Sequence, residues 1–173
     1  RLADTRDGAG NRLTAGAVLR VPVRGVGGVP ADASAVAVTV TATGSSLPGF
    51  ATVTPCGSPP AATSNVNFAA GATVPNLVVA APGPDGAICI TANVDTHLVV
   101  DLFGAFAATA QLGVGRPQRL VDTREGLGAP KQRVAAGGVV AITIAGDGLP
   151  NAVSGAMLNL TAVAPDGDGY LTA

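Results

Sequence analysis

The chain has 173 residues, a net charge of −1 and a charged fraction of only 12%. Its ten basic residues form no cluster, which argues against nucleic acid as a partner, and no apolar run approaches the roughly 20 residues of a membrane-spanning helix. The first residue is Arg1 rather than Met, so we expect the chain to be a processed or partial segment of a longer protein.

The sequence predicts an all-β protein built from short strands. The chain contains 24 Gly and 13 Pro, and they are spread along it rather than pooled in one tract. Such a distribution is typical of many tight turns between strands. No stretch combines a helical stripe of apolar residues with capping residues, so we expect no helix.

The chain opens with the octet RLADTRDG, in which Asp4, Thr5 and Arg6 are the sharpest local signal. Their short spacing lets a carboxylate and a guanidinium form charge-assisted hydrogen bonds, or lets each bind nearby backbone groups. One role is a ligand clamp, in which the arginine recognises a carboxylate or a sugar hydroxyl. The other is an architectural lock that fixes the first strand and turn of a module.

The clearest strand prediction covers Ala35–Thr43, where valines alternate with alanine and threonine so that one face lies on a core. Further strands are predicted at Val18–Arg24, Phe50–Thr54, Asn65–Ala69, Asn76–Ala81, Ala87–Ala92 and His97–Phe103. About eight short strands per module favour an antiparallel β-sandwich of jelly-roll type, with a barrel or a trefoil as the alternative.

The two cysteines, Cys56 and Cys89, each lie beside turn residues. One interpretation is a pair of small, buried apolar side chains. The other is a disulfide, which we favour because few charges and abundant Thr and Gly suit a secreted wall protein. The pair does not suit zinc, since the sequence offers only one histidine as a further ligand.

That histidine is His97, and Asp95 and Asp101 lie near it in the sequence. The three residues are candidates for a ligand site or, with a serine, for a hydrolase triad. The sequence has no GxSxG nucleophile elbow and no serine beside a Gly-rich oxyanion loop, which argues against catalysis. We expect a packed or strand-end histidine, no enzymatic activity, and no cofactor or metal.

A second octet, RLVDTREG, begins at Arg119 and carries Asp122, Thr123 and Arg124. Further segments align in the same order, so that VAITIAG corresponds to LRVPVRG and LPNAVSGAMLNLTAV to VPADASAVAVTVTAT. Recurrence at equivalent points favours the lock for both motifs, because each module must solve the same folding problem.

The repeat predicts a complete β-module at residues 1–115 and the first half of a second copy at residues 116–173. The alternation of Ala35–Thr43 recurs at residues 156–162, where we expect the same strand. The missing half of the second copy can come from a neighbouring chain, from the first module, or from residues beyond Ala173.

Asp166 and Asp168, in the segment PDGDGY, resemble a fragment of a calcium loop. A complete loop needs a further oxygen ligand and a distal glutamate, and neither follows. We therefore interpret the segment as a β-turn.

The whole pattern resembles a repeat of secreted or cell-wall proteins from actinobacteria and related high-GC bacteria. The resemblance rests on RL-x-DTR-(D/E)-G, on VP-x-x-A before alternating Val and Thr, and on TVTPCG, SNVNF, TVPN, DGAICI and HLVVDLFGAF. It implies a surface-exposed β-rich module, often in tandem or appended to other domains. It implies no reaction and no established ligand.

We expect a non-catalytic, extracellular structural or adhesive β-module that acts by repetition in a cell-surface array or a self-assembling filament. The expected partner is the protein itself, as a homopolymer or as tandem modules, with cell-wall glycan as a second partner. The alternative is a cell-wall or carbohydrate-binding module appended to a secreted enzyme.

Overall fold

The computed structural model describes residues 1–7, 11–59, 61–109, 117–144, 156–167 and 171. The chain divides into two compact units, Arg1–Arg119 and Leu120–Ala173. All strands found in the described residues belong to the first unit.

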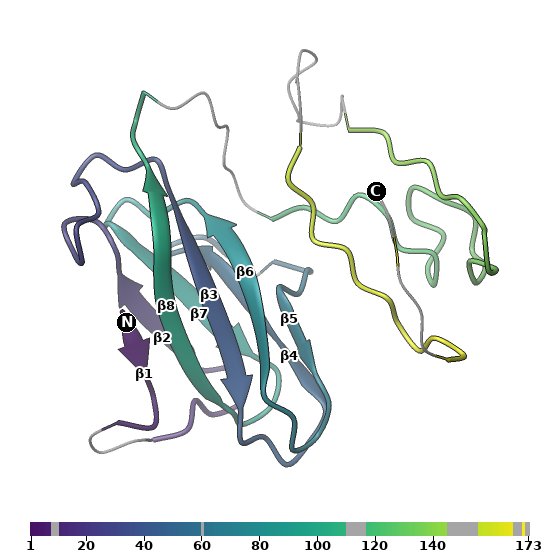
Figure 1. The fold of residues 1–173 in the computed structure, drawn as a ribbon, viewed down its shortest axis with the longest axis horizontal. Coiled ribbons are helices and arrows are strands. Elements are labelled where there is room, and N and C mark those ends of the chain that lie inside the picture. Colours follow the sequence, from purple (N-terminus) through teal and green to yellow (C-terminus); the bar gives the residue numbers. More distant parts are fainter. Residues whose placement is uncertain (8–10, 60, 110–116, 145–155, 168–170, 172–173) are drawn as a thin grey trace. The chain divides into compact units, whose positions relative to one another are not determined.

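The first unit is an antiparallel sandwich of eight strands (Figure 1). The strands are β1 (Ala3–Asp4), β2 (Val18–Pro22), β3 (Ala35–Thr43), β4 (Gly49–Pro55), β5 (Val66–Phe68), β6 (Val74–Ala80), β7 (Ala87–Ala92) and β8 (His97–Phe106). Each segment predicted as a strand in the first copy overlaps one of them, and β3 and β7 match the predicted bounds.

The strands form two four-stranded sheets, with the orders β1-β8-β3-β6 and β2-β7-β4-β5. In Figure 1, β8, β3 and β6 lie in the nearer sheet, with β7 and β4 behind them. Eight strands in two packed sheets are the arrangement of a jelly roll. The predicted sandwich is therefore confirmed, and the barrel and trefoil alternatives are wrong.

Every ladder in this sandwich joins its first half to its second half. β1 pairs with β8, β2 with β7, β3 with β6 and β8, and β4 with β5 and β7. We call residues 1–56, which contain β1–β4, the first limb, and residues 66–106, which contain β5–β8, the second limb. Within the described part of the chain neither limb has a ladder of its own, so each obtains its inter-strand hydrogen bonds from the other.

The core between the sheets is built from small apolar side chains. Val36, Val38 and Val40 of β3 are fully buried, as are Ile88 and Ile90 of β7. Successive side chains of a strand point to opposite faces, so the valines of β3 enter the core while its threonines lie on the outer face.

The second unit contains no strand in its described residues, where its only bridge joins Asp122 to Leu127. The strand expected at residues 156–162 is therefore wrong. Its counterpart, β3, pairs only with β6 and β8, and the sequence of the second copy matches the first limb alone. The second unit thus has the alternating pattern of a strand but not the segments that such a strand pairs with.

Candidate functional site

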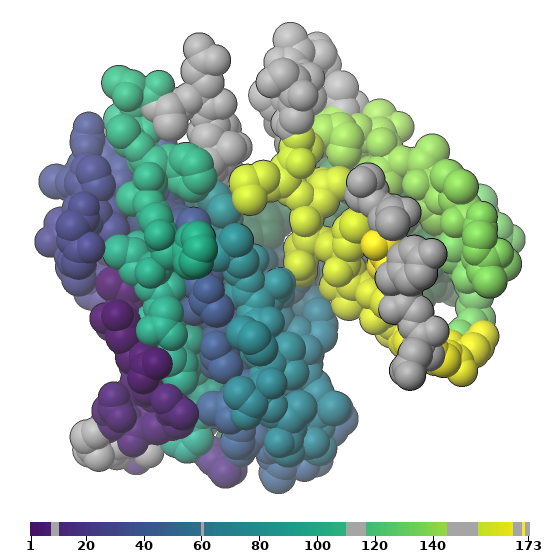
Figure 2. Space-filling model, viewed as in Figure 1, coloured from purple at the N-terminus to yellow at the C-terminus, as the bar shows by residue number. Residues whose placement is uncertain are grey.

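The Asp-Thr-Arg motif of the first unit lies where β1 meets β8. The N–H of Leu2 donates to the carbonyl of Val100 at 2.8 Å, and the N–H of Thr5 donates to the carbonyl of Leu98 at 3.0 Å. Figure 2 shows the N-terminal segment, in purple, beside the green β8 on the surface. The motif therefore attaches the start of the first limb to the last strand of the second.

The carboxylate of Asp4 accepts hydrogen bonds from two arginines. Arg6 donates from its backbone N–H (3.0 Å), Nε (2.9 Å) and Nη2 (2.7 Å), and Arg1 donates from Nη1 (2.6 Å). Only 2% of the Asp4 side chain is exposed, whereas about half of each arginine side chain is. The carboxylate is thus enclosed by its own neighbours, and it holds the fork of Arg6 in one orientation.

These hydrogen bonds determine the ionisation of the motif. The bond from the Arg6 side chain, assisted by the Arg6 backbone N–H and by the charges of Arg6 and Arg1, holds the pKa of Asp4 well below its usual range against the opposing effect of burial. The same bond raises the pKa of Arg6. At neutral pH both groups are charged, and two of the Arg6 donors are used by Asp4 rather than offered to a ligand.

The hydroxyl of Thr5 connects the motif to β8. It accepts the N–H of Leu98 at 2.9 Å and lies 3.1 Å from Nδ1 of His97. His97 begins β8 and pairs across the ladder with Thr43. The histidine therefore lies at a strand end, hydrogen-bonded to the motif.

The second motif repeats the same internal bonds. Arg124 donates to Asp122 from its backbone N–H (3.0 Å), Nε (3.0 Å) and Nη2 (2.7 Å). The side chain of Asp122 is 6% exposed, and Asp122 and Leu127 exchange two backbone bonds around the turn. Gly126 has a φ of 75°, a conformation that favours glycine. The described part of the second unit has no sheet, so the motif forms this turn outside a sheet.

The three ligand candidates do not converge on one another. Asp95 accepts the N–H of Ala15 at 2.8 Å, and Asp101 accepts from Nε of Arg1 at 3.0 Å. With His97 bonded to Thr5, each of the three links the second limb to a different point of the first limb. This arrangement holds the limbs together and does not assemble a triad.

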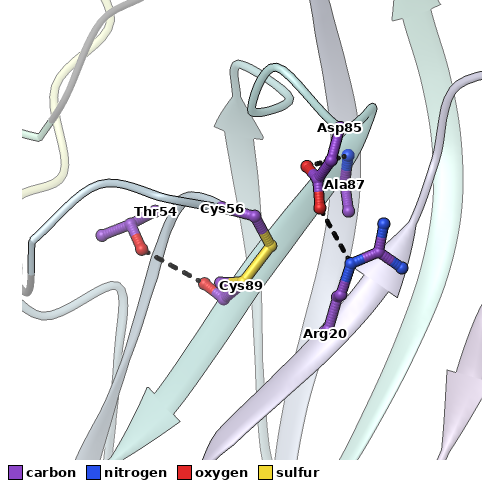
Figure 3. Close-up of a disulfide and its surroundings, with 6 residues drawn as sticks. All are labelled: Arg20, Thr54, Cys56, Asp85, Ala87 and Cys89. Atoms are coloured by element: carbon purple, nitrogen blue, oxygen red, sulfur yellow. Dashed lines mark hydrogen bonds and ion pairs between the residues drawn. A yellow bond between two sulfur atoms is a disulfide. The ribbon is translucent and has the colours of Figure 1, made fainter.

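Cys56 and Cys89 form a disulfide, which confirms the pairing favoured from the sequence (Figure 3). Cys56 follows β4 and Cys89 lies in β7, so the bond joins the two limbs. A β-carbon at Gly83 would collide with the backbone of Cys56, which explains why this approach needs glycine.

Beside the disulfide, Nε of Arg20 donates to Asp85 at 2.8 Å (Figure 3). This hydrogen bond lowers the pKa of Asp85. The ion pair is a further bond between the first limb and the second.

Sequence reasoning missed several of the bonds between or beside the limbs. Arg1 binds Asp101, Asn93 accepts the N–H of Phe50 (2.6 Å), and Asn65 accepts the N–H of Val53 (2.7 Å). The partners are separated by 100, 43 and 12 residues, so no local pattern indicates them. The only available signal is the preference of asparagine for bonds to backbone groups near turns.

The calcium candidate is not assembled in the described residues. Asp166 accepts from Nη2 of Arg133 at 2.7 Å, and Asp168 lies outside the described residues. A search of the described part of the chain finds no group of three His, Cys, Asp or Glu side chains that could hold a metal ion.

No protein family, no curated protein and no solved structure matches this chain. Among the residues that the structure describes, no helix is long and apolar enough to cross a membrane. The resemblance to actinobacterial surface repeats therefore stays an expectation from the sequence.

Proposed function

We propose that this chain is a non-catalytic, extracellular structural or adhesive β-module, used repeatedly in a cell-surface array or filament. The observation that carries the proposal is the identical internal bonding of Asp4 with Arg6 and of Asp122 with Arg124. A motif that recurs with its arginine fork turned onto its own carboxylate supports a repeated architectural role. A ligand clamp would instead have to present that fork outward.

Two further features support this role. The disulfide suits an oxidising compartment, such as the cell surface. The candidates for acid–base catalysis are His97, Asp95 and Asp101. Each of them forms a hydrogen bond between the limbs. A module whose titratable side chains are held in such bonds is suited to a structural role rather than to acid–base catalysis.

The sheets also offer surfaces for lateral association. β6 and β5 are edge strands, and Leu77 of β6 is 51% exposed. An open edge with an exposed apolar side chain is a site at which copies of a protein associate. We therefore expect self-association of the module, which is the property an array requires.

The test is the assembly state of the purified, oxidised chain, measured by light scattering over a range of concentrations and by electron microscopy. We expect regular assemblies larger than a monomer. A monomer at every concentration would contradict the array role. If that monomer also sediments with purified cell-wall glycan, the carbohydrate-binding alternative becomes the better account.

A further inference from the structure

We infer that Arg12 and Gly44 form a binding site for the carboxylate of an acidic peptide. The site lies at the end of the sandwich where β3 ends and β8 begins. Arg12 precedes Leu13, which exchanges two backbone hydrogen bonds with Thr96 just before β8, and Gly44 directly follows the last residue of β3. The fold thus brings the arginine to the turn that leaves β3.

The side chains of Arg12 and His97 both come close to Gly44. A β-carbon on Gly44 would lie 3.9 Å from Nη2 of Arg12 and 3.3 Å from Cδ2 of His97. Gly44 is exposed and has a φ of 69°, a conformation that favours glycine, so it presents bare backbone next to both side chains. Nδ1 of His97 is bonded to Thr5, which leaves Nε2, the ring neighbour of Cδ2, for a ligand.

Arg12 differs from the other arginines of the sandwich in having no acceptor. In the described part of the chain, its exposed guanidinium forms neither a hydrogen bond nor an ion pair. The other arginines of residues 1–106 each donate to an aspartate or to a backbone carbonyl, namely Arg1, Arg6, Arg20 and Arg24. The planar, charged donor group of Arg12 is therefore offered to a ligand.

The second copy of the repeat shows which group such an arginine binds. RLTAG at Arg12 aligns with RVAAG at Arg133, and TATG, which ends at Gly44, aligns with TAVA, which ends at Ala164. Nη2 of Arg133 donates to the carbonyl of Ala164 and to the carboxylate of Asp166, both at 2.7 Å. Ala164 has a φ of 47°, in the same left-handed region as Gly44. The equivalent arginine thus holds a carboxylate beside the equivalent turn.

The first copy has the arginine and the turn but not the carboxylate. Asp166 corresponds to Ser46, and the sequence has no Asp or Glu between Asp32 and Asp85. A carboxylate from a partner would therefore take the place that Asp166 fills in the second copy. Because the bound group there is an aspartate side chain, we assign the ligand as an acidic peptide.

The experiment is a titration of the oxidised, ¹⁵N-labelled full chain followed by nuclear magnetic resonance. The probe is N-acetyl-aspartate N-methylamide, and the matched neutral probe is the asparagine compound. We expect saturable shifts of the amide signals of Gly44 and His97 with the aspartate probe only. Shifts that are equal with both probes, or that leave these two signals unmoved, would overturn the inference.

Two arginine variants test whether binding depends on this position. Arg12→Gln is expected to weaken binding of the aspartate probe by at least about fivefold, because it removes the charge of the donor. The matched control is Arg20→Gln, which removes the same charge from another exposed position of the sandwich and should leave the affinity unchanged. Equal weakening in both variants would mean that the probe responds to overall charge, and the site would be rejected.

A third variant gives the first copy the carboxylate of the second. Ser46→Asp should place a carboxylate within reach of Arg12, as Asp166 is of Arg133, and should abolish binding of the probe. Ser46→Asn is its neutral control and should bind the probe like the original chain. If Ser46→Asp binds the probe unchanged, the two turns are not equivalent and the inference fails.

Glucuronate, which carries a carboxylate on a sugar ring, tests the class of the ligand. If it binds more tightly than the aspartate probe, the assignment to a peptide is wrong. The site and the proposed array role fail separately, because light scattering of the chain alone tests the role and the titration tests the site.

Discussion

A single carboxylate organises the turn that begins each copy. Asp4 and Asp122 each collect three bonds from the arginine two residues later, and both are almost fully enclosed. Only in the first copy does the adjacent threonine also reach a strand of the second limb, through Leu98 and His97. The local bonds are therefore common to both copies, and the connection to a sheet is what distinguishes them.

Replacing Asp4 with Asn should lower the thermal midpoint of the first unit by several degrees, because an amide cannot accept the charge-assisted fork of Arg6. Circular dichroism during heating measures the midpoint. The matched control is Asp122→Asn, which breaks the same bonds in a unit without strands in its described residues and should leave the midpoint unchanged. Equal losses in both variants would contradict the link between Asp4 and the sandwich.

The depressed pKa of Asp4 predicts the direction of a pH effect. The carboxylate is a stronger acid in the folded chain than in the unfolded one, so its contribution to stability is fully present above the unfolded pKa of about 4. That contribution is lost as the pH falls below this value toward the folded pKa. Denaturation midpoints measured from pH 7 to pH 2 should therefore fall in acid, and less steeply in Asp4→Asn. If the midpoint of Asp4→Asn falls with pH as steeply as that of the original chain, other carboxylates dominate the loss of stability in acid.

At the scale of strands, the decisive feature is that each limb supplies only half of every ladder. β3 has the same alternating pattern as residues 156–162, yet only β3 is a strand, because it lies between β6 and β8. Side-chain alternation selects the face that a strand would bury. A partner strand is what fixes its backbone.

A matched pair of substitutions tests this difference. Val40→Ala should destabilise the first unit by about 2–3 kcal/mol, since it removes buried methyl groups and leaves a cavity. Leu160→Ala, at the corresponding position of the second copy, removes a side chain that is 46% exposed and should change the free energy of unfolding by less than about 0.5 kcal/mol. Denaturant unfolding measures both. A comparable loss at Leu160 would mean that the second copy has a core of its own.

The strands of the first copy could be predicted from the sequence because their pattern is local. Alternation and flanking turns placed Ala35–Thr43 and Ala87–Ala92 correctly, and turn residues beside Cys56 and Cys89 were compatible with the bridge. The pairing order of the strands could not be predicted from the sequence, because it joins residues as distant as Ala3 and Val100. The order places β3 between β6 and β8, and the described residues of the second unit contain no strands in these positions.

The two copies of the repeat differ in structure, because the first is closed into a sandwich and the described residues of the second contain no strand. All ladders between named strands, the disulfide and the core cluster belong to residues 1–106. The stability of the chain is therefore concentrated in its first unit.

A chain that ends at residue 117 should consequently unfold with the same denaturant midpoint as the full chain. The reason is that the deletion removes none of the ladders between the limbs. The chain has no Trp whose fluorescence could report unfolding, so unfolding is followed by far-ultraviolet circular dichroism. A lower midpoint in the shortened chain would show that residues 118–173 stabilise the sandwich.

The disulfide between the limbs also limits how far the module can be stretched. β1 and β8 run antiparallel, so a pull on residues 1 and 106 opens their ladder one pair at a time from its end. Cys56 and Cys89 are 33 residues apart, and the loop that they close bears no tension while the bond is intact. Reduction would release about 110 Å of additional contour length. In a module under load at a cell surface, the redox state would thus set the maximum extension.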